Sequence, residues 1–485
     1  MEERIQTDPA AMLFPTVEYA LFFLVVFAIA WTLRRPLWLH KALLLTASYL
    51  FYGYWNWRFV PLLAGISLFS AGVAKQLQRT NAQGRRKILI ASGVTACLVV
   101  LGFFKYRGFA VVQLAQLLAR EGIAWSPKVP EVALPVGISF FVFHAISLMV
   151  DAYRGKLSVK VTVLDALLYV AFFPQLVAGP ILRASQFMPQ LARPRDPGDI
   201  DAARALELIV LGLVKKVLIA NFLATHLVDA VFENPAGRSG LEVLCGVYGY
   251  AAQIYCDFSG YTDIAIGSAL LLGYRFPENF HNPYVSASPQ EFWRRWHISL
   301  SSWLRDYLYV SLGGNRGGAF RTYVNLFVTM ILGGLWHGAA WTFVAWGALH
   351  GAALAVHRAW SSIRWSPLAR LRESGPWTGF AQLLMFHFVC LTWILFRAPT
   401  FSTAIAVCQA LFAPWSVGPW FSPVLGLCLV GGIAAQYLPD SLTDRARAAF
   451  AQLPLPVQGM AFSTSVLLIE TFGPSGIAPF IYFQF

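Results

Sequence analysis

The stretch ALFFLVVFAIAWTL, residues 20–33, contains no charged side chain and represents the kind of segment that decides the fold class of this chain. Similar apolar runs recur from Met12 to the C-terminus, for example over residues 89–104. Their lengths approach the roughly 17–25 apolar residues that a helix needs to cross a bilayer. We count about eleven plausible spans, several of them short or interrupted by Gly and Pro. The sequence therefore predicts an all-α polytopic membrane protein.

The charge of the chain also fits a membrane protein. Only 13% of the 485 residues are charged, against about 25% in soluble proteins. The net charge of +13 lies largely in short loops between apolar runs, such as the loops around Arg34 and around Arg85. By the positive-inside rule these two loops are expected on the cytoplasmic side, which places the N-terminus outside. This pattern predicts contact with a lipid bilayer and no contact with nucleic acid.

The organisation of the chain is predicted to be simple. Residues 1–12 are polar and are interpreted as an N-terminal extension, followed by one membrane domain over residues 13–485 with a catalytic core at about 134–357. The two halves share no visible repeat, which weakens the interpretation as an inverted-repeat transporter. The six cysteines form no CxxC pair, and zinc signatures such as HExxH are absent, so no metal site is predicted.

One region, residues 277–320, is too polar to face lipid. The segment SPQE, which starts at Ser288, fits a capping box with Pro289 at the first helical position. A helix is therefore expected from Ser288 to about Leu312, ended by the glycines that follow. On such a helix Trp293, His297 and Ser301 would share one face.

Two interpretations of this helix remain open. It could lie at the membrane interface, with arginines near phosphates and tryptophans in the aromatic belt. Alternatively it lines a water-filled cavity, which accounts better for His297 because ionisable groups at membrane depth are usually functional. Arg294 and Arg305 would stack on a neighbouring face, eleven residues apart.

A second histidine, His337, lies in LGGLWHGAAWTFVAWGALHG, residues 332–351, among small residues. Small residues permit close helix packing or leave space beside an imidazole. A core histidine bonded to a neighbouring helix is the alternative interpretation. A buried imidazole stays neutral and accepts protons, which suits acyl transfer from a thioester, whereas no GxSxG elbow of a serine hydrolase is present.

Two carboxylates, Asp257 and Asp263, lie in the otherwise apolar run over residues 255–276. Asp257 could orient a catalytic group. A structural role is favoured, in which each carboxylate pairs with an arginine of the following helix, because an unpaired charge is costly there.

Several long motifs resemble the membrane-bound O-acyltransferase (MBOAT) superfamily, in particular its bacterial alginate O-acetyltransferase branch. They are YCDFSGYTDIAIG from Tyr255, NFHNPYVSASPQEFWRRWHISLSSWLRDYLYVSLGGNRGG from Asn279, and the LWHG motif around His337. The segment GPILR from Gly179 and the closing PFIYFQF also resemble that branch. The similarity extends over nearly the whole chain.

This resemblance implies a ring of transmembrane helices, with re-entrant or interfacial helices, around a central tunnel. It implies that His337 is the main catalytic residue and His297 its partner, with no bound cofactor and acetyl-CoA or another acyl thioester as donor. The candidates for donor binding or tunnel lining are Trp293, Arg294, Ser301, Arg305, Asp257, Trp336 and Trp341.

The function that the resemblance implies is acetyl transfer across the bacterial inner membrane. A periplasmic SGNH-type acetyltransferase, or another acetyl acceptor protein, would then modify an exported polysaccharide such as alginate or cellulose, together with a polysaccharide synthesis and export complex. Two alternatives remain open, namely D-alanyl transfer from a carrier protein to a cell-wall polymer, and a non-catalytic subunit of an export machine.

Overall fold

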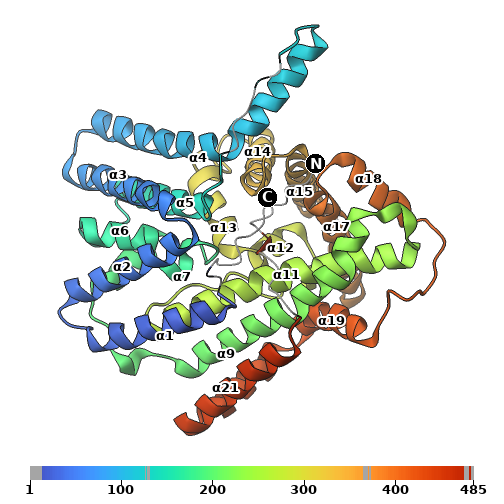
Figure 1. The fold of residues 1–485 in the computed structure, drawn as a ribbon. Helices are drawn as coiled ribbons and strands as arrows, with labels where there is room; N and C mark the ends of the chain where they lie inside the picture. The colour runs from blue at the N-terminus through green and yellow to red at the C-terminus, as the bar shows by residue number, and fades with distance from the viewer. Residues whose placement is uncertain are drawn as a thin grey trace. The chain divides into compact units, whose positions relative to one another are not determined.

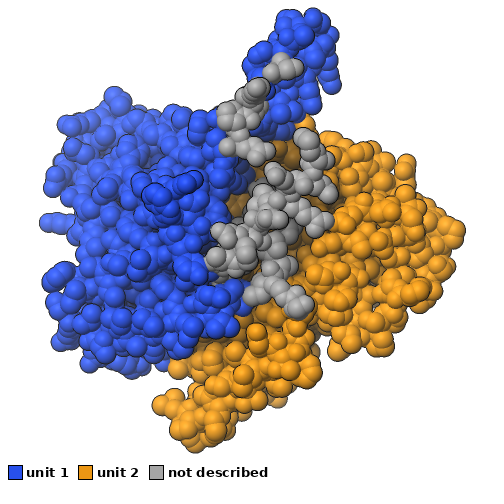
Figure 2. Space-filling model, viewed as in Figure 1, with its two compact units in different colours: residues 1–200, 268–276 blue, residues 201–267, 277–485 orange. Residues whose placement is uncertain are grey.

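The structure is a computed structural model, which describes residues 12, 14–125, 127, 132–363, 370, 373–474 and 480–481. Residues 1–11 of the predicted extension over residues 1–12, and most of the closing PFIYFQF motif, lie outside this part of the chain. The described residues form helices and contain no strand (Figure 1), which confirms the predicted all-α class. Two compact units are present, residues 1–200 with 268–276, and residues 201–267 with 277–485 (Figure 2).

The first unit is built from apolar helices that begin close to the predicted spans. α2 and α3 follow one another through the short turn Trp57–Phe59 and together form one helical segment, Leu37–Arg79. Most of the remaining helices pack on this segment, with α5 and α6 against α3, and α8 packs on α5 and α6. The helices of this unit are α1 (Val17–Thr32), α2 (Leu37–Asn56), α3 (Val60–Arg79), α4 (Gln83–Arg120), α5 (Ile138–Tyr153), α6 (Val163–Ala171), α7 (Phe173–Leu176) and α8 (Ala184–Leu191).

Buried polar groups fix the GPILR segment inside this unit. His144 on α5 is completely buried, and its Nε2 accepts a hydrogen bond from the backbone N–H of Leu182 at 3.2 Å. The Tyr169 hydroxyl donates to the backbone carbonyl of Leu182 at 2.7 Å. Because buried backbone groups need partners, these two side chains hold an irregular segment at a depth where water is excluded. The structure therefore gives His144 a structural partner.

The second unit contains the polar region that the sequence singles out. Its first helical segment, Ala202–Glu233, includes two π-helical stretches, and it is tied to α11 by ion pairs described below. The helices are α9 (Ala202–Leu213), η3 (Val214–Asn221), η4 (Ala224–Val228), α10 (Asp229–Glu233), α11 (Gly240–Leu271, of which residues 240–267 belong here), α12 (Pro289–Arg295), α13 (Ile298–Trp303), η7 (Leu304–Tyr309), α14 (Ala319–His337), α15 (Trp341–Ser362), α17 (Gly375–Arg397), α18 (Phe401–Ala410), α19 (Pro423–Ala434), α20 (Asp440–Ala451) and α21 (Leu455–Phe472).

Several of these helices suit a membrane. Among the described residues, five helices are long and apolar enough to cross a bilayer, or six if the bent pair Pro423–Tyr437 and Asp440–Ala451 counts as one span. The predicted number of about eleven is therefore not confirmed, because many of the apolar runs form short or joined helices. The five helices are Leu37–Arg79, Gln83–Arg120, Ala202–Glu233, Gly375–Arg397 and Leu455–Phe472.

α14 and α15 form an antiparallel pair that positions the second histidine motif, and Figure 1 shows them side by side. Glycines allow the two backbones to approach closely. A Cβ on Gly334 would lie 2.2 Å from the carbonyl oxygen of Phe343, and one on Gly347 would lie 2.4 Å from that of Met330. Both distances are impossible for real atoms, so the small residues around His337 serve close helix packing, one of the two roles expected from the sequence.

Candidate active site

The helix that carries His297 begins where the sequence predicts. Ser288 Oγ accepts a hydrogen bond from the Glu291 backbone N–H at 3.2 Å, and Pro289 is the first helical residue. The Glu291 carboxylate accepts from the backbone N–H of Ala287 at 2.9 Å. In an ideal capping box it would accept from the N–H of the next residue, Ser288. The predicted capping of this helix is therefore confirmed.

The predicted continuation of this helix to Leu312 is wrong. α12 ends at Arg295, Trp296 is extended, and His297 adopts the left-handed conformation with φ 41° and ψ 55°. α13 then begins at Ile298. A left-handed residue that is not glycine costs roughly 1–2 kcal/mol, so the surrounding structure must hold it in place. The break thus lies at the histidine itself.

The segment that precedes α12 supplies the bonds that stabilise this break. The Ile298 N–H donates to the carbonyl of Asn279 at 2.9 Å, and the His281 N–H donates to the carbonyl of Arg295 at 2.9 Å. The side-chain oxygen of Asn279 accepts from the Ser299 N–H at 3.1 Å and lies 3.2 Å from His297 Nδ1. Because these partners lie about eighteen residues earlier, local sequence patterns around His297 could not reveal the break.

As a result, the predicted shared face of Trp293, His297 and Ser301 does not form. Trp293 on α12 contacts the rings of Trp346 and His350, with centroid distances of 5.7 and 5.2 Å. Ser301 on α13 donates its hydroxyl to the carbonyl of Trp296 at 3.1 Å. A face defined by one continuous helix is lost when the helix breaks between its members.

His297 is completely buried in an aromatic environment, outside the five helices that are long enough to span a membrane. Its ring lies edge-on to Phe258 of α11 at 4.6 Å and stacks on Phe280 at 6.3 Å. Burial lowers the pKa of His297 to about 3. The imidazole is therefore neutral near neutral pH, and a neutral imidazole can accept a proton.

His337 is the last residue of α14 and is also buried. It lies edge-on to the rings of Trp336, Trp346 and Phe396, with centroid distances of 5.0, 5.1 and 5.1 Å. Trp336 in turn contacts the ring of His297 at 6.1 Å. The structure therefore brings both predicted histidines to one indole in the same unit.

The other candidate residues are located as follows. Trp336 is buried between the two histidine contacts, whereas Arg294, Arg305 and Trp341 are exposed. Arg305 pairs with its neighbour Asp306 at 2.8 Å, and 64% of its side chain is exposed. Donor binding or tunnel lining by these residues stays a prediction, as does the tunnel itself.

Asp257 does not pair with an arginine of the following helix, and that expectation is wrong. Its carboxylate forms a buried ion pair with Lys216 of η3 and accepts from the Ile481 N–H at 2.9 Å. Asp263 pairs with Lys215 at 2.7 Å. The partners lie on the preceding helix because η3 packs beside α11 and presents lysines to both carboxylates.

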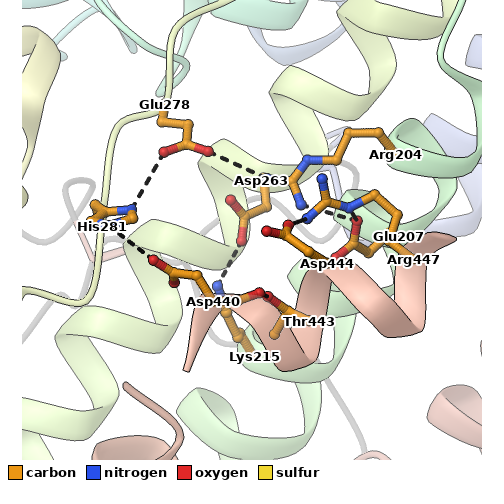
Figure 3. A network of polar contacts seen from close by, with 10 residues as sticks. All are labelled: Arg204, Glu207, Lys215, Asp263, Glu278, His281, Asp440, Thr443, Asp444 and Arg447. Atoms are coloured by element: carbon orange, nitrogen blue, oxygen red, sulfur yellow. Dashed lines mark hydrogen bonds and ion pairs between the residues drawn. The ribbon is translucent and has the colours of Figure 1, made fainter. Parts of the chain in front are cut away.

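A network of polar contacts includes Glu278 and His281, which precede and follow Asn279 in the chain (Figure 3). Glu278 bonds to Arg204 at 3.4 Å and to His281 at 3.6 Å, and His281 also lies 3.7 Å from Asp440 of α20. Arg447 completes the network through Glu207 and Asp444, both at 2.7 Å. The residues on either side of Asn279 thus have polar contacts with α9 and α20.

Residues that the sequence did not single out complete the site. They are Asn279, Phe258, Trp346, His350 and Phe396, which contact one or other of the two histidines or the aromatic rings beside them. His350 Nε2 and Thr392 Oγ1 form a hydrogen bond of 3.1 Å. No periodicity marks these residues, since they come from four separate segments; only the density of polar and aromatic residues after Asn279 points to that part of the chain.

The fold and the site together define a class, a helical membrane protein with two buried histidines at a shared aromatic ring. Residues 95–397 match the family model described as "MBOAT, membrane-bound O-acyltransferase family". The chain belongs to this family, is a multi-pass membrane protein and is an O-acyltransferase. The resemblance found in its motifs is thereby confirmed.

Individual relatives refine this result. The chain is 42% identical over 414 residues to "Probable alginate O-acetylase AlgI" of Pseudomonas aeruginosa, which covers 84% of this chain and 76% of the relative. It is 35% identical over 406 residues to a peptidoglycan O-acetyltransferase of Helicobacter pylori, covering 78% and 74%. A teichoic acid D-alanyltransferase of Bacillus subtilis is 28% identical over 281 residues, covering 55% and 69%.

Proposed function

We propose that this protein is an O-acetyltransferase that passes an acetyl group from a cytoplasmic thioester, such as acetyl-CoA, across the inner membrane. The acceptor is a periplasmic protein of the SGNH acetyltransferase class or another acetyl acceptor, which serves the O-acetylation of an exported polysaccharide such as alginate. The observation that supports this proposal best is the burial of His297 and His337 against the same Trp336 indole.

The chemistry follows from the properties of a neutral imidazole. One imidazole takes the proton from the acceptor hydroxyl while the hydroxyl oxygen attacks the thioester carbonyl. The carbon–sulfur bond breaks, the acetyl group stays on the acceptor oxygen, and the imidazolium gives its proton to the leaving thiolate, which restores the neutral imidazole. We assign His337 as the main catalytic residue and His297 as its partner, and no step requires a metal or a bound cofactor.

The identities to relatives favour acetyl over D-alanyl transfer. The similarity to O-acetyltransferases of alginate and peptidoglycan extends over about four-fifths of the chain, against 55% for the D-alanyltransferase of Bacillus subtilis. D-alanyl transfer from a carrier protein to a cell-wall polymer remains the second candidate. Mass spectrometry of the modified polymer distinguishes the two, because an acetyl and an alanyl group add different masses.

Substitution of each histidine tests the catalytic proposal. In a strain that secretes the polymer, His337→Ala and His297→Ala should each lower polymer acetylation by about 10²- to 10⁴-fold, with the protein still present in the membrane. His226→Ala is the matched control, because His226 is exposed on η4. Acetylation that persists in either variant would remove that histidine from the mechanism, and loss of secreted polymer itself would favour an export subunit.

A further inference from the structure

Asn279 makes an unusual set of contacts beside His297. Its side-chain oxygen Oδ1 accepts hydrogen bonds from the Ser299 N–H at 3.1 Å and from the Ser299 hydroxyl at 2.8 Å, and it lies 3.2 Å from His297 Nδ1. Its backbone carbonyl accepts from the Ile298 N–H at 2.9 Å. Asn279 is itself 1% exposed. These contacts join the first two N–H groups of α13 and the imidazole to a single residue.

The orientation of the Asn279 amide follows from its backbone partner. A backbone N–H can only donate, so the amide atom that faces the Ser299 N–H must be the acceptor oxygen and not the NH₂ group. Ser299 directs its hydroxyl at the same atom. A flipped amide would place two donors against each other in a buried site, which is costly.

The amide orientation in turn determines the tautomer of His297. Asn279 Oδ1 lies 3.2 Å from Nδ1 and can only accept, whereas the Ser299 hydroxyl lies 3.5 Å from Nδ1 and 2.8 Å from Oδ1, to which it donates. This geometry favours a proton on Nδ1. In a neutral imidazole the second nitrogen, Nε2, then carries a lone pair and no proton. Nε2 becomes the atom that is able to accept a proton from a hydroxyl.

Polar and charged side chains lie on both sides of Asn279. Glu278 is bonded to Arg204 and His281, and His281 also reaches Asp440, as Figure 3 shows. The bonds that Asn279 itself accepts from Ser299 and from the Ile298 N–H reduce the freedom of the amide to move away from the imidazole. The arrangement is that of a proton acceptor whose other nitrogen is bound by an orienting group.

We propose that Asn279 is a positioning residue, which fixes His297 as the Nδ1–H tautomer, so that Nε2 is the nitrogen with which this partner histidine accepts a proton. This inference rests on the proposed function of His297. A simpler role is also consistent with the contacts, in which Asn279 only caps the N-terminus of α13. The two roles differ in what they predict for the protonation of His297.

The groups that face His297 matter for any dependence on pH. The elements packed against it present the aromatic rings of Phe258, Phe280 and Trp336. The charged residues and histidines next to these contacts on the same elements are Asp257, Glu278, His281, Glu291, Arg294, Arg295 and His337, and Lys216 of η3 lies against Asp257. Of these, Asp257 is paired with Lys216, Arg295 with Glu291, and Glu278 with His281.

The direct test is a nitrogen NMR spectrum of the full-length protein in lipid nanodiscs, with ¹⁵N-labelled histidine. The His297 signals are identified by their loss in His297→Gln. We expect a protonated Nδ1 and an unprotonated Nε2 in the wild-type protein. A protonated Nε2 would overturn the proposal. Because this measurement needs no turnover, its outcome is separate from the activity of His297→Ala, which tests the proposed function.

Activity measurements distinguish positioning from capping. Asn279→Ala should lower acetylation by about 10²-fold. Asn279→Asp keeps an acceptor for α13 but places a carboxylate beside Nδ1–H, so it should move the acid limb of the pH–rate profile to higher pH. An Asn279→Asp profile identical to that of the wild-type protein would show capping alone. Ser302→Ala is the control, since its hydroxyl only bonds to the Ser299 carbonyl on the same helix.

Discussion

His297 and His337 contact the same indole ring, that of Trp336, with centroid distances of 6.1 and 5.0 Å. The two residues lie forty positions apart, one at a break between short helices and the other at the end of α14. Trp336 is the residue just before His337, so the contact with His297 also fixes the end of α14. The aromatic ring is therefore a physical link between the two candidate catalytic groups.

Loss of this ring should affect both histidines. Trp336→Ala removes a buried indole and is expected to lower the free energy of unfolding by about 3–5 kcal/mol and to abolish acetylation. Trp336→Phe keeps a ring in the same place and should retain part of both. Thermal unfolding in detergent and polymer acetylation measure these effects. Trp38→Ala, at a position 63% exposed on α2, is the control, and equal stability of Trp336→Ala and Trp38→Ala would contradict the link.

The start of the His297 region could be predicted because capping depends on four consecutive residues. Ser288 and Glu291 bond to backbone groups within their own turn, so the sequence alone contains the signal. The break at His297 depends on the Asn279 side chain, and nothing in the local pattern encodes which distant residue will bond there. The same limit explains the wrong partners for Asp257 and Asp263, because the identity of a packed helix is a property of the tertiary fold.

The burial of His337 among small residues was also accessible from the sequence, because glycines beside a histidine indicate close packing. The predicted number of about eleven spans is not confirmed. Runs of apolar residues such as those around Trp57 look like two spans, yet the structure joins them into one helical segment. Hydropathy records composition, whereas helix bends and joins depend on packing.

Close packing of α14 on α15 should not tolerate a methyl group at Gly334. Gly334→Ala would place Cβ 2.2 Å from the Phe343 carbonyl oxygen and push the helices apart near His337. We expect a loss of about 1–3 kcal/mol in the free energy of unfolding and reduced acetylation. Gly431→Ala on α19 is the matched control, because no atom lies within 4 Å of its added Cβ. It should be neutral or stabilise by up to about 1 kcal/mol, and a Gly334→Ala protein that unfolds like the wild type would refute the packing argument.

The buried ion pair between Lys216 and Asp257 should be structural. Asp257→Ala leaves the ammonium of Lys216 buried without its carboxylate and should cost about 3–5 kcal/mol of stability. The double variant Lys216→Met with Asp257→Leu should recover most of that loss. Arg305→Ala breaks an exposed pair and should cost less than about 1 kcal/mol. Acetylation measured in the stable double variant separates a structural role of Asp257 from a role in catalysis. Full inactivity there would indicate that Asp257 orients a catalytic group.

The burial of His297 also predicts how stability depends on pH. Burial lowers the pKa of His297 to about 3, below the ordinary value of 6.5. Below pH 6.5 the unfolded chain binds a proton at this residue that the folded chain does not bind, so acid favours unfolding. The free energy of unfolding should therefore fall by up to about 1.4 kcal/mol per pH unit as the pH drops from 6.5 towards 3. Thermal unfolding at pH 7.5 and 5.5 measures this loss in wild-type protein and in His297→Gln, where the contribution of this residue is absent. Between pH 7.5 and 5.5 the free energy of unfolding should decrease less in the variant than in the wild-type protein, by about 1 kcal/mol, whatever the stability of the variant at pH 7.5. Equal decreases would mean that His297 takes up a proton in the folded protein as readily as in the unfolded chain.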